Sequence, residues 1–193
     1  MLRYISSFIP AHIRSPLLLA PVSFLLYNVT RRNIRRQFYR GKMTVYHGSY
    51  ITIKNPRIIK GKNTKDFGPG FYCTVIREQA ERWAKRYDTS IVNIYTVRLD
   101  TRLNILEFQT MTEEWLDFII SCRHSTAHKY DIVIGAMAND QIYNYIADYI
   151  DGIITREQFW ALARFKYPTH QINFCTPAAL QCLEYVSSEE VTI

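Results

Sequence analysis

Between residues 43 and 193, apolar residues fall into short runs whose spacing changes from one run to the next. Several runs of four to nine residues are rich in β-branched and aromatic side chains, which is typical of strands. The longest, IVNIYTVRL, would place its side chains alternately on two faces. We expect strands at residues 43–47, 71–74, 91–99, 131–137, 171–176 and 182–186.

Other segments carry apolar residues at helical spacing behind a capping residue. Thr112 stands before two glutamates, whose negative charge suits the first turn of a helix. Thr155 and Gln158 have the spacing of a capping box, and Thr176 followed by proline has the preferred order for a helix start. One stripe of the first segment holds Ala80, Trp83, Ala84 and Tyr87. We expect helices at residues 77–87, 112–123, 141–150 and 156–165, and a short one after Thr176.

The order of these elements favours an α+β fold. Strands gather toward the two ends of the region and helices lie between them, without a regular strand–helix–strand alternation. Such an order fits largely antiparallel sheets better than a doubly wound parallel sheet. The chain has 193 residues, which is enough for one well-buried domain and short for two.

Charge divides the chain at about residue 42. The net charge is +7, but residues 1–42 hold eight Lys and Arg and no acidic residue, whereas residues 43–193 hold sixteen against seventeen. The near-neutral body gives no support for a nucleic-acid partner. For residues 1–42 three interpretations stay open: an extension upstream of a start at Met43, a weak membrane anchor, or a targeting segment. The core domain is then residues 43–193.

The four cysteines, Cys73, Cys122, Cys175 and Cys182, form no CxxC pair and have no histidine at zinc-ligand spacing. We therefore expect free thiols in a reducing compartment, no bound metal, and a cytoplasmic protein, with membrane association or targeting through residues 1–42 as the alternative.

Two short motifs, YHGS at residues 46–49 and DFGPGFY at residues 66–72, contain three of the chain's seven glycines. His47 can bond a hydroxyl group, and Gly48 lets a flat ligand approach the main chain. Phe71 and Tyr72 must point to opposite faces of a strand, so one ring enters the core and the other can line a groove. Alone, each motif is also explained by a packed histidine or by a hairpin turn.

Taken in order, these motifs resemble the signature of the ADP-ribosyltransferases. The likeness is closest to the diphtheria-toxin and poly(ADP-ribose) polymerase branch, whose signature is His-Tyr-Glu. From Met43 to about Val186 the chain also resembles a bacterial family of uncharacterised domains. The shared motifs, in order, are YHGS, KDFGPGFY, QAERWA, EEWLDFI, DIVIGAMAND and HQINFCT. The resemblance implies two small, mainly antiparallel sheets that enclose an NAD cleft, with inserted helices.

The resemblance also implies roles for individual residues. His47 would bind a ribose hydroxyl of NAD, and the main chain of Gly48 would hold the nicotinamide carboxamide. Tyr72 would stack on the nicotinamide ring, with Trp83 as the second stacking ring. Ser49 and Gly70 would lie close to the ligand. The third signature position falls on Gln171, where the better-known enzymes have Glu.

The activity implied is transfer of one ADP-ribose unit from NAD to a macromolecule, without metal. A bacterial toxin or effector, with an antitoxin protein as partner, fits this resemblance. Because Gln171 carries no charge, a silent module that binds NAD or ADP-ribose and an NAD glycohydrolase stay open. Replacing Gln171 with Glu is then expected to raise the rate.

Other polar residues have two interpretations each. Asp140 can belong to a substrate loop, although Asn139 or Asp140 as a helix cap is favoured. Lys65 and Asp66 can touch a pyrophosphate or fix the glycine turn. Glu184, near the end of the chain, is a candidate for the missing carboxylate.

Overall fold

The computed structural model describes residues 41–60, 65–100, 102–163 and 169–192. The predictions for residues 1–42 fall almost entirely outside these ranges. Within them, no helix is long and apolar enough to cross a membrane.

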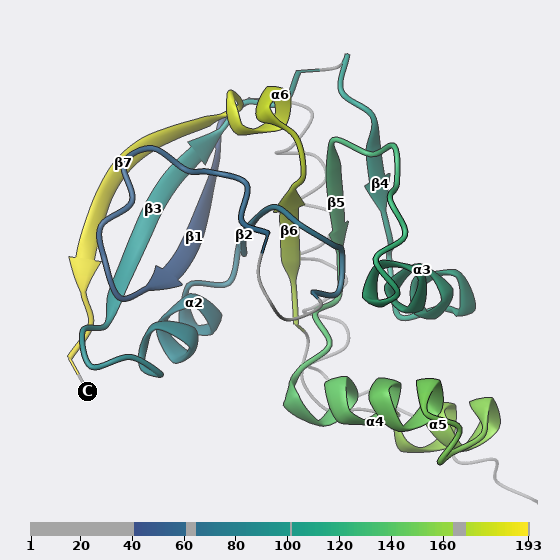
Figure 1. The fold of residues 1–193 in the computed structure, drawn as a ribbon. Helices are drawn as coiled ribbons and strands as arrows, with labels where there is room; N and C mark the ends of the chain where they lie inside the picture. Colours follow the sequence, from purple (N-terminus) through teal and green to yellow (C-terminus); the bar gives the residue numbers. More distant parts are fainter. Residues whose placement is uncertain (1–40, 61–64, 101, 164–168, 193) are drawn as a thin grey trace, which may run out of the picture.

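Seven strands and five helices make up the described part of the chain (Figure 1). The strands are β1 (Met43–Ser49), β2 (Phe71–Cys73), β3 (Ile91–Val97), β4 (Ile105–Glu107), β5 (Ile132–Gly135), β6 (Gln171–Phe174) and β7 (Leu183–Glu190). The helices are α2 (Arg77–Ala84), α3 (Glu113–Arg123), α4 (Asp140–Ile150), α5 (Arg156–Leu162) and α6 (Pro177–Leu180).

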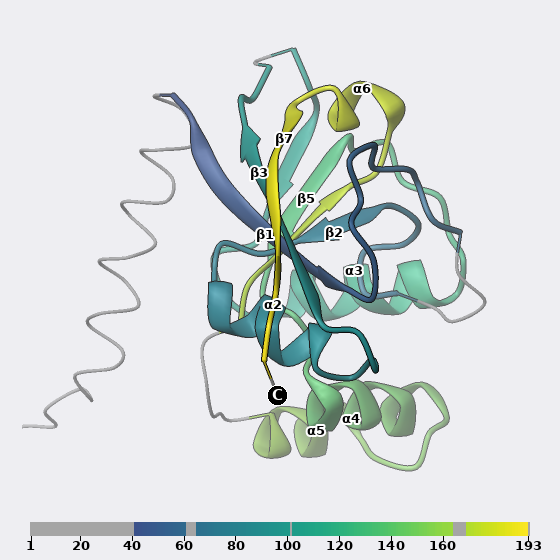
Figure 2. The ribbon, with the colours of Figure 1, turned by 90° about the vertical axis from the view of Figure 1, so that its left-hand side faces the viewer.

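The strands form two small sheets, one of order β1-β3-β7 and one of order β2-β6-β5-β4. All pairings are antiparallel except β4 with β5. The two sheets can be followed in Figures 1 and 2. The expectation of an α+β fold with mostly antiparallel sheets is confirmed.

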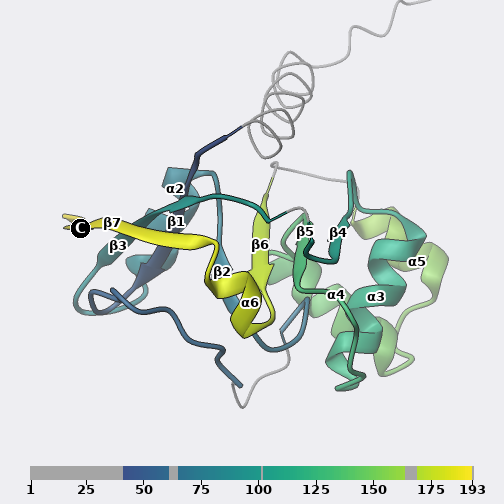
Figure 3. The ribbon, with the colours of Figure 1, turned by 90° about the horizontal axis from the view of Figure 1, so that it is seen from above.

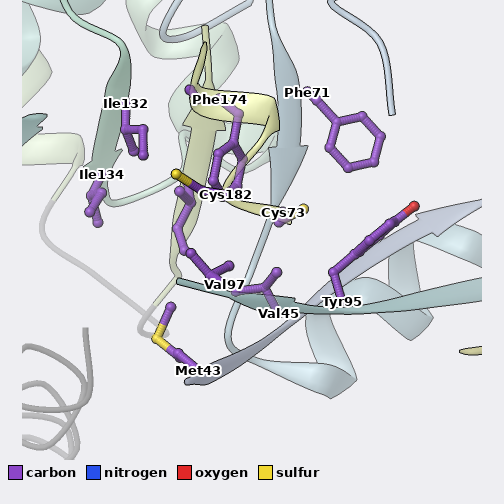
Figure 4. Close-up of a cluster of buried hydrophobic side chains, with 12 residues drawn as sticks. Met43, Val45, Phe71, Cys73, Tyr95, Val97, Ile132, Ile134, Phe174 and Cys182 are labelled. Atoms are coloured by element: carbon purple, nitrogen blue, oxygen red, sulfur yellow. The ribbon is translucent and has the colours of Figure 1, made fainter. Parts of the chain in front are cut away.

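The sheets pack face to face around one apolar core (Figure 4). Met43, Val45 and Tyr95 from the three-stranded sheet meet Phe71 and Phe174 from the four-stranded sheet. Removing a side chain of this size from water contributes about 1.5–3 kcal/mol, so this core holds the two sheets together. A main-chain bridge between Tyr46 and Thr74 also joins β1 to the end of β2.

Helix α2 covers the other face of the three-stranded sheet. Ala80 and Ala84 are buried there against Val92 and Ile94. The predicted apolar stripe is confirmed for the two alanines and wrong for the two aromatic residues. Trp83 is 39% exposed, and Tyr87 is also exposed and lies beyond the end of the helix. Small alanines let the helix approach the sheet closely, which larger rings at these positions would prevent.

Helices α3, α4 and α5 cover the outer face of the four-stranded sheet. Figure 3 shows α3, α4 and α5 on the opposite side of that sheet from β1, β3 and β7. Trp115 is fully buried in this second core, and its indole N–H donates to the Ala136 carbonyl at 3.1 Å. Helix α3 packs over Phe67 and Val133, and helices α4 and α5 complete the layer.

The predicted helix caps are confirmed. The hydroxyl of Thr112 accepts from the Trp115 N–H, and Thr155 with Gln158 forms a capping box. Asn139 rather than Asp140 caps α4, and Thr176 caps α6. Strand β4 was not predicted, and β7 continues to Glu190, beyond the predicted end at residue 186.

Candidate functional site

His47 lies on β1 and reaches the free edge of β2. Its Nδ1 is 2.6 Å from the main-chain oxygen of Tyr72, and its ring stacks on Phe71 with centroids 4.4 Å apart. A carbonyl oxygen can only accept, so Nδ1 carries the hydrogen. In a neutral ring, Nε2 is then a hydrogen-bond acceptor.

The surroundings favour this neutral form of His47. Burial lowers its pKa below the ordinary 6.5, the hydrogen bond to Tyr72 opposes that shift, and the charge of Lys65 adds to it. At neutral pH the ring therefore offers Nε2 as an acceptor, which suits the hydroxyl group of a ligand.

Gly48 faces two different neighbours. The N–H and C=O of Tyr46 are both hydrogen-bonded to Thr74. Because the main-chain groups of successive residues in an antiparallel strand point to alternate edges, those of Gly48 point to the same edge of β1 as those of Tyr46. On its other side, a Cβ on Gly48 would lie 2.2 Å from the Ala80 oxygen of α2. The residue must therefore be glycine for packing, and it also leaves main-chain polar groups at the sheet edge.

The hydroxyl of Ser49 is committed to a turn. It donates to the Ile51 carbonyl at 2.5 Å and accepts from the Asn93 amide at 3.1 Å. Ser49 is buried, so the geometry makes it a fixed part of the loop after β1.

Tyr72 closes the glycine turn. Its phenol oxygen accepts from the Phe67 N–H at 3.1 Å and donates to the Gly68 carbonyl at 2.6 Å. Burial, with the negative charge of Asp66, raises its pKa well above 10.0, so the phenol stays neutral. The Lys65 ammonium lies 5.4 Å from the ring centroid.

The rings of His47 and Tyr72 do not stack on each other. Phe71 and Tyr72 point to opposite faces of β2, and Phe71 is the buried ring, as expected. His47 meets the Phe71 ring and the main chain of Tyr72. A ligand that contacts both the imidazole and the phenol ring would have to wrap around the edge of β2.

Asn173 on β6 holds the glycine turn from the other side. Its amide donates to the Phe67 carbonyl at 2.8 Å and to the Gly68 carbonyl at 3.3 Å. Gly68 has φ +73°, and a Cβ on Gly70 would lie 1.9 Å from the Asn173 Oδ1. These contacts account for both glycines of FGPG by turn geometry and close packing.

Gln171 lies at the start of β6, on the same face of the sheet as Tyr72. In the β2–β6 register Cys73 pairs with Ile172, and one further step places Gln171 opposite Thr74. Thr74 in turn bridges Tyr46 of β1. Two strand spacings, or roughly 10 Å, therefore separate Gln171 from the part of β1 that carries His47 and Gly48.

The side chain of Gln171 is buried in a polar network. Its Nε2 is 3.1 Å from Asp66 Oδ2 and 3.3 Å from the Ala136 oxygen. Asp66 also accepts from the Arg123 guanidinium at 3.1 Å and from the Ala138 N–H at 2.9 Å. Neither interpretation of Asp66 at the sequence level, pyrophosphate contact or turn cap, describes this role.

Burial raises the pKa of Asp66, and the charge of Arg123 and the donated hydrogen bonds oppose the rise. Arg123 and Asp66 are both almost fully buried, so each charge depends on the other for compensation.

Trp83 lies on the same side of α2 as Gln79, four residues earlier. The Gln79 amide bonds the main chain of His170 twice, at 2.7 and 3.1 Å, and so fixes α2 beside the start of β6. The Arg86 guanidinium lies 4.3 Å from the Trp83 ring and also pairs with Asp140. Trp83 is thus near the site, with one face occupied by Arg86.

Other sequence candidates lie elsewhere. Glu184 is exposed on β7 and bonds Thr96 of the three-stranded sheet, so it does not replace a carboxylate on β6. Asp140 begins α4 and pairs with Arg86. All four cysteines are free thiols, and Cys175 alone among them is only half-buried. Among the described residues, no His, Cys, Asp and Glu cluster could hold a metal ion.

Sequence reasoning missed Gln79, Arg123 and Asn173, and it missed the role of Asp66. Each acts on a partner far away in the chain, for example 91 residues for Gln79 and 57 for Asp66 with Arg123. The one available signal was an acidic residue placed directly before the apolar FGPGFY motif.

Residues 43–185 match the model of a family described as protein of unknown function, DUF3990. No curated protein matches the chain.

Proposed function

The chain belongs to the DUF3990 family, and from the geometry of its site we propose that it is an ADP-ribosyltransferase-like domain that binds NAD and transfers one ADP-ribose unit to a macromolecule. The observation that carries this proposal is the neutral His47 at the edge of β2, whose Nε2 is an acceptor beside the main-chain groups of Gly48. Hydroxyl, carboxamide and flat ring are the groups that such an arrangement would recognise.

Each part of the ligand has a partner in this proposal. A ribose hydroxyl donates to Nε2 of His47, and the carboxamide exchanges hydrogen bonds with the main chain of Gly48. The nicotinamide ring lies against Tyr72, with Trp83 as the second ring. Stacking on Trp83 requires the Arg86 guanidinium to leave that face. Because the adenosine ribose is separated from the nicotinamide by the pyrophosphate, that ribose and the nicotinamide ring can lie on either side of the β2 edge.

In the proposed reaction the bond between ribose C1′ and the nicotinamide nitrogen breaks, and neutral nicotinamide leaves with the bonding electrons. Positive charge grows on the ribose, as in glycoside hydrolysis. A nucleophile of the acceptor then supplies an electron pair to C1′ and loses a proton to solvent. Gln171 accepts a hydrogen bond from a ribose hydroxyl but carries no charge.

The uncharged Gln171 sets the expected rate. Losing one preorganised electrostatic contact costs on the order of 3 kcal/mol in the transition state. Slow, single transfer fits this better than chain elongation, and such a transferase would suit a toxin or effector restrained by a partner protein. The buried, uncharged side chain of Gln171 also favours a second candidate, a module that binds NAD without turnover.

Incubation of the full chain with NAD labelled in its ADP-ribose part tests the proposal. We expect release of nicotinamide together with label on a protein or nucleic acid from the source cells. Nicotinamide without labelled acceptor would indicate a glycohydrolase, and saturable binding without nicotinamide would indicate a module. No binding at all would contradict each of these readings.

A further inference from the structure

A buried carboxylate, Asp66, lies directly behind the Gln171 side chain. One of its oxygens accepts from Arg123, and the other accepts from both the Ala138 N–H and the Gln171 amide. Arg123 is held in turn by Tyr143, whose main-chain oxygen accepts at 3.0 Å and whose ring lies 4.0 Å from the guanidinium. Three hydrogen-bond donors therefore fix the position of the Asp66 carboxylate.

These contacts determine which way the Gln171 amide points. Both neighbours of its Nε2, the Asp66 carboxylate and the Ala136 carbonyl, can only accept hydrogen bonds. The nitrogen must therefore face them, and the amide oxygen leaves the same carbon in a different direction. A flipped amide would set its oxygen against two acceptor oxygens inside the protein, which is strongly unfavourable.

We propose that Asp66 is a positioning residue of the NAD site: it holds the Gln171 amide with its nitrogen inward, so that the carbonyl oxygen is the group offered to the ribose. This inference rests on the proposed function. It means that Gln171 offers the ligand the same kind of group, an acceptor oxygen, that a glutamate would offer.

The orientation matters for the transition state because the amide is a dipole. With Asp66 in place, the negative end of the dipole faces the ribose, where positive charge grows as nicotinamide leaves. With the amide reversed, its N–H groups would face that charge instead. Asp66 thus acts on the rate through Gln171, without touching the ligand.

The same contact changes the expectation for Gln171→Glu. A second carboxylate at this position would lie in hydrogen-bonding contact with Asp66, and two such groups cannot both be charged without strong repulsion. We therefore expect the single variant to be less stable and no faster than the wild type, in contrast to the gain expected from the sequence.

The test compares Asp66→Asn, Gln171→Glu and the double variant in the full chain, with nicotinamide release as the readout of kcat and KM. Asp66→Asn should lower kcat by about tenfold or more, with a smaller change in KM, because a preorganised contact is lost. In the double variant, the new Asn amide donates to the new Glu, whose other oxygen faces the ribose. We expect its kcat to return to the wild-type value or to exceed it.

Asp131→Asn is the matched control. Asp131 accepts from the Asn104 N–H and the Thr176 hydroxyl, at the end of the β5–β6 pair opposite to Gln171. This variant should lose stability, measured by thermal unfolding, and keep its kcat.

Two results overturn the inference alone: wild-type kinetics in Asp66→Asn, or a double variant no faster than Asp66→Asn. If Asp66→Asn does not fold, Gln171→Glu decides, because a faster enzyme of unchanged melting temperature would show that Asp66 does not constrain this side chain. Failure of the wild type to bind or cleave NAD would overturn the proposed function itself, and this inference with it.

Discussion

The imidazole of His47 has a carbonyl as its hydrogen-bond partner, and a carbonyl oxygen can only accept a hydrogen bond. The Gln171 amide has the same property, since it faces a carboxylate and a carbonyl. In both residues an acceptor-only neighbour uses up the donor and leaves an acceptor atom, Nε2 or Oε1, for other partners. The chemistry of the site at the residue scale follows from these neighbours rather than from the side chains alone.

The lowered pKa of His47 predicts a particular loss of stability in acid. As the pH falls, His47 takes up a proton near pH 6.5 in the unfolded chain, but only at a lower pH in the folded chain. Its contribution to the free energy of unfolding is therefore fully present above pH 6.5. That contribution is lost as the pH falls from 6.5 through the lower folded pKa. Urea unfolding at pH 7.5 and pH 5 should show a smaller acid loss for His47→Gln than for the wild type.

His124→Gln is the control for this experiment, because His124 is exposed. It should show the acid loss of the wild type. Equal acid losses in the wild type and both variants would mean that His47 is not held in its neutral form.

Gly48→Ala should destabilise the fold by about 1–3 kcal/mol, because the new methyl group would meet main-chain atoms of α2 that cannot move aside singly. Gly41→Ala is the matched control, since a Cβ there meets nothing within 4 Å. Chemical unfolding measures both. Equal stability of the two variants would contradict the close approach of α2 to β1.

Among the elements, helix α2 contacts both sheets. Its alanines pack on the three-stranded sheet, and Gln79 binds the main chain of His170 just before β6 of the other sheet. The helix therefore keeps Trp83 near the start of β6, and it fixes the spacing between β1 and Gln171.

Gln79→Ala should lower the unfolding free energy by about 2 kcal/mol or more, since two buried main-chain groups lose their Gln79 hydrogen bonds. NAD affinity should fall with it, because α2 is no longer fixed beside β6. Glu78→Ala, at the exposed neighbouring position of the same helix, should change stability by less than about 1 kcal/mol. NAD titration measures the affinity of both variants, and urea unfolding measures their stability. Equal affinity and equal stability in the two variants would contradict the role of Gln79.

Local signals predicted the elements well, and for a physical reason. Caps such as Thr112 and Thr155 act within three or four residues, so their partners can be read directly from the sequence. Strand β4 is only three residues long and lies parallel to β5, so it left no pattern of its own. Trp83 is exposed although it shares its predicted stripe with two buried alanines, because helical spacing does not say whether alanine or tryptophan faces the sheet.

At the scale of the whole molecule, the candidate site exists only where the two sheets meet. His47 and Tyr72 could be proposed from motifs, and the fold brings them into hydrogen-bonding contact. The contact between Gln171 and Asp66 joins residues 105 positions apart, and no pattern in a single sequence reveals such a pair. The motifs therefore pointed to His47, Tyr72 and Gln171, but the sequence revealed neither the hydrogen-bonding network around them nor the part that Gln79, Arg123 and Asn173 take in it.

Titration of NAD into the full chain, followed by calorimetry at pH 7.5, shows whether the site around His47 binds NAD. We expect saturable binding of one NAD per chain, weakened about tenfold or more in His47→Ala, which removes the acceptor nitrogen, and unchanged in His124→Ala. Absence of NAD binding to the wild type, or equal affinity in all three proteins, would contradict this expectation.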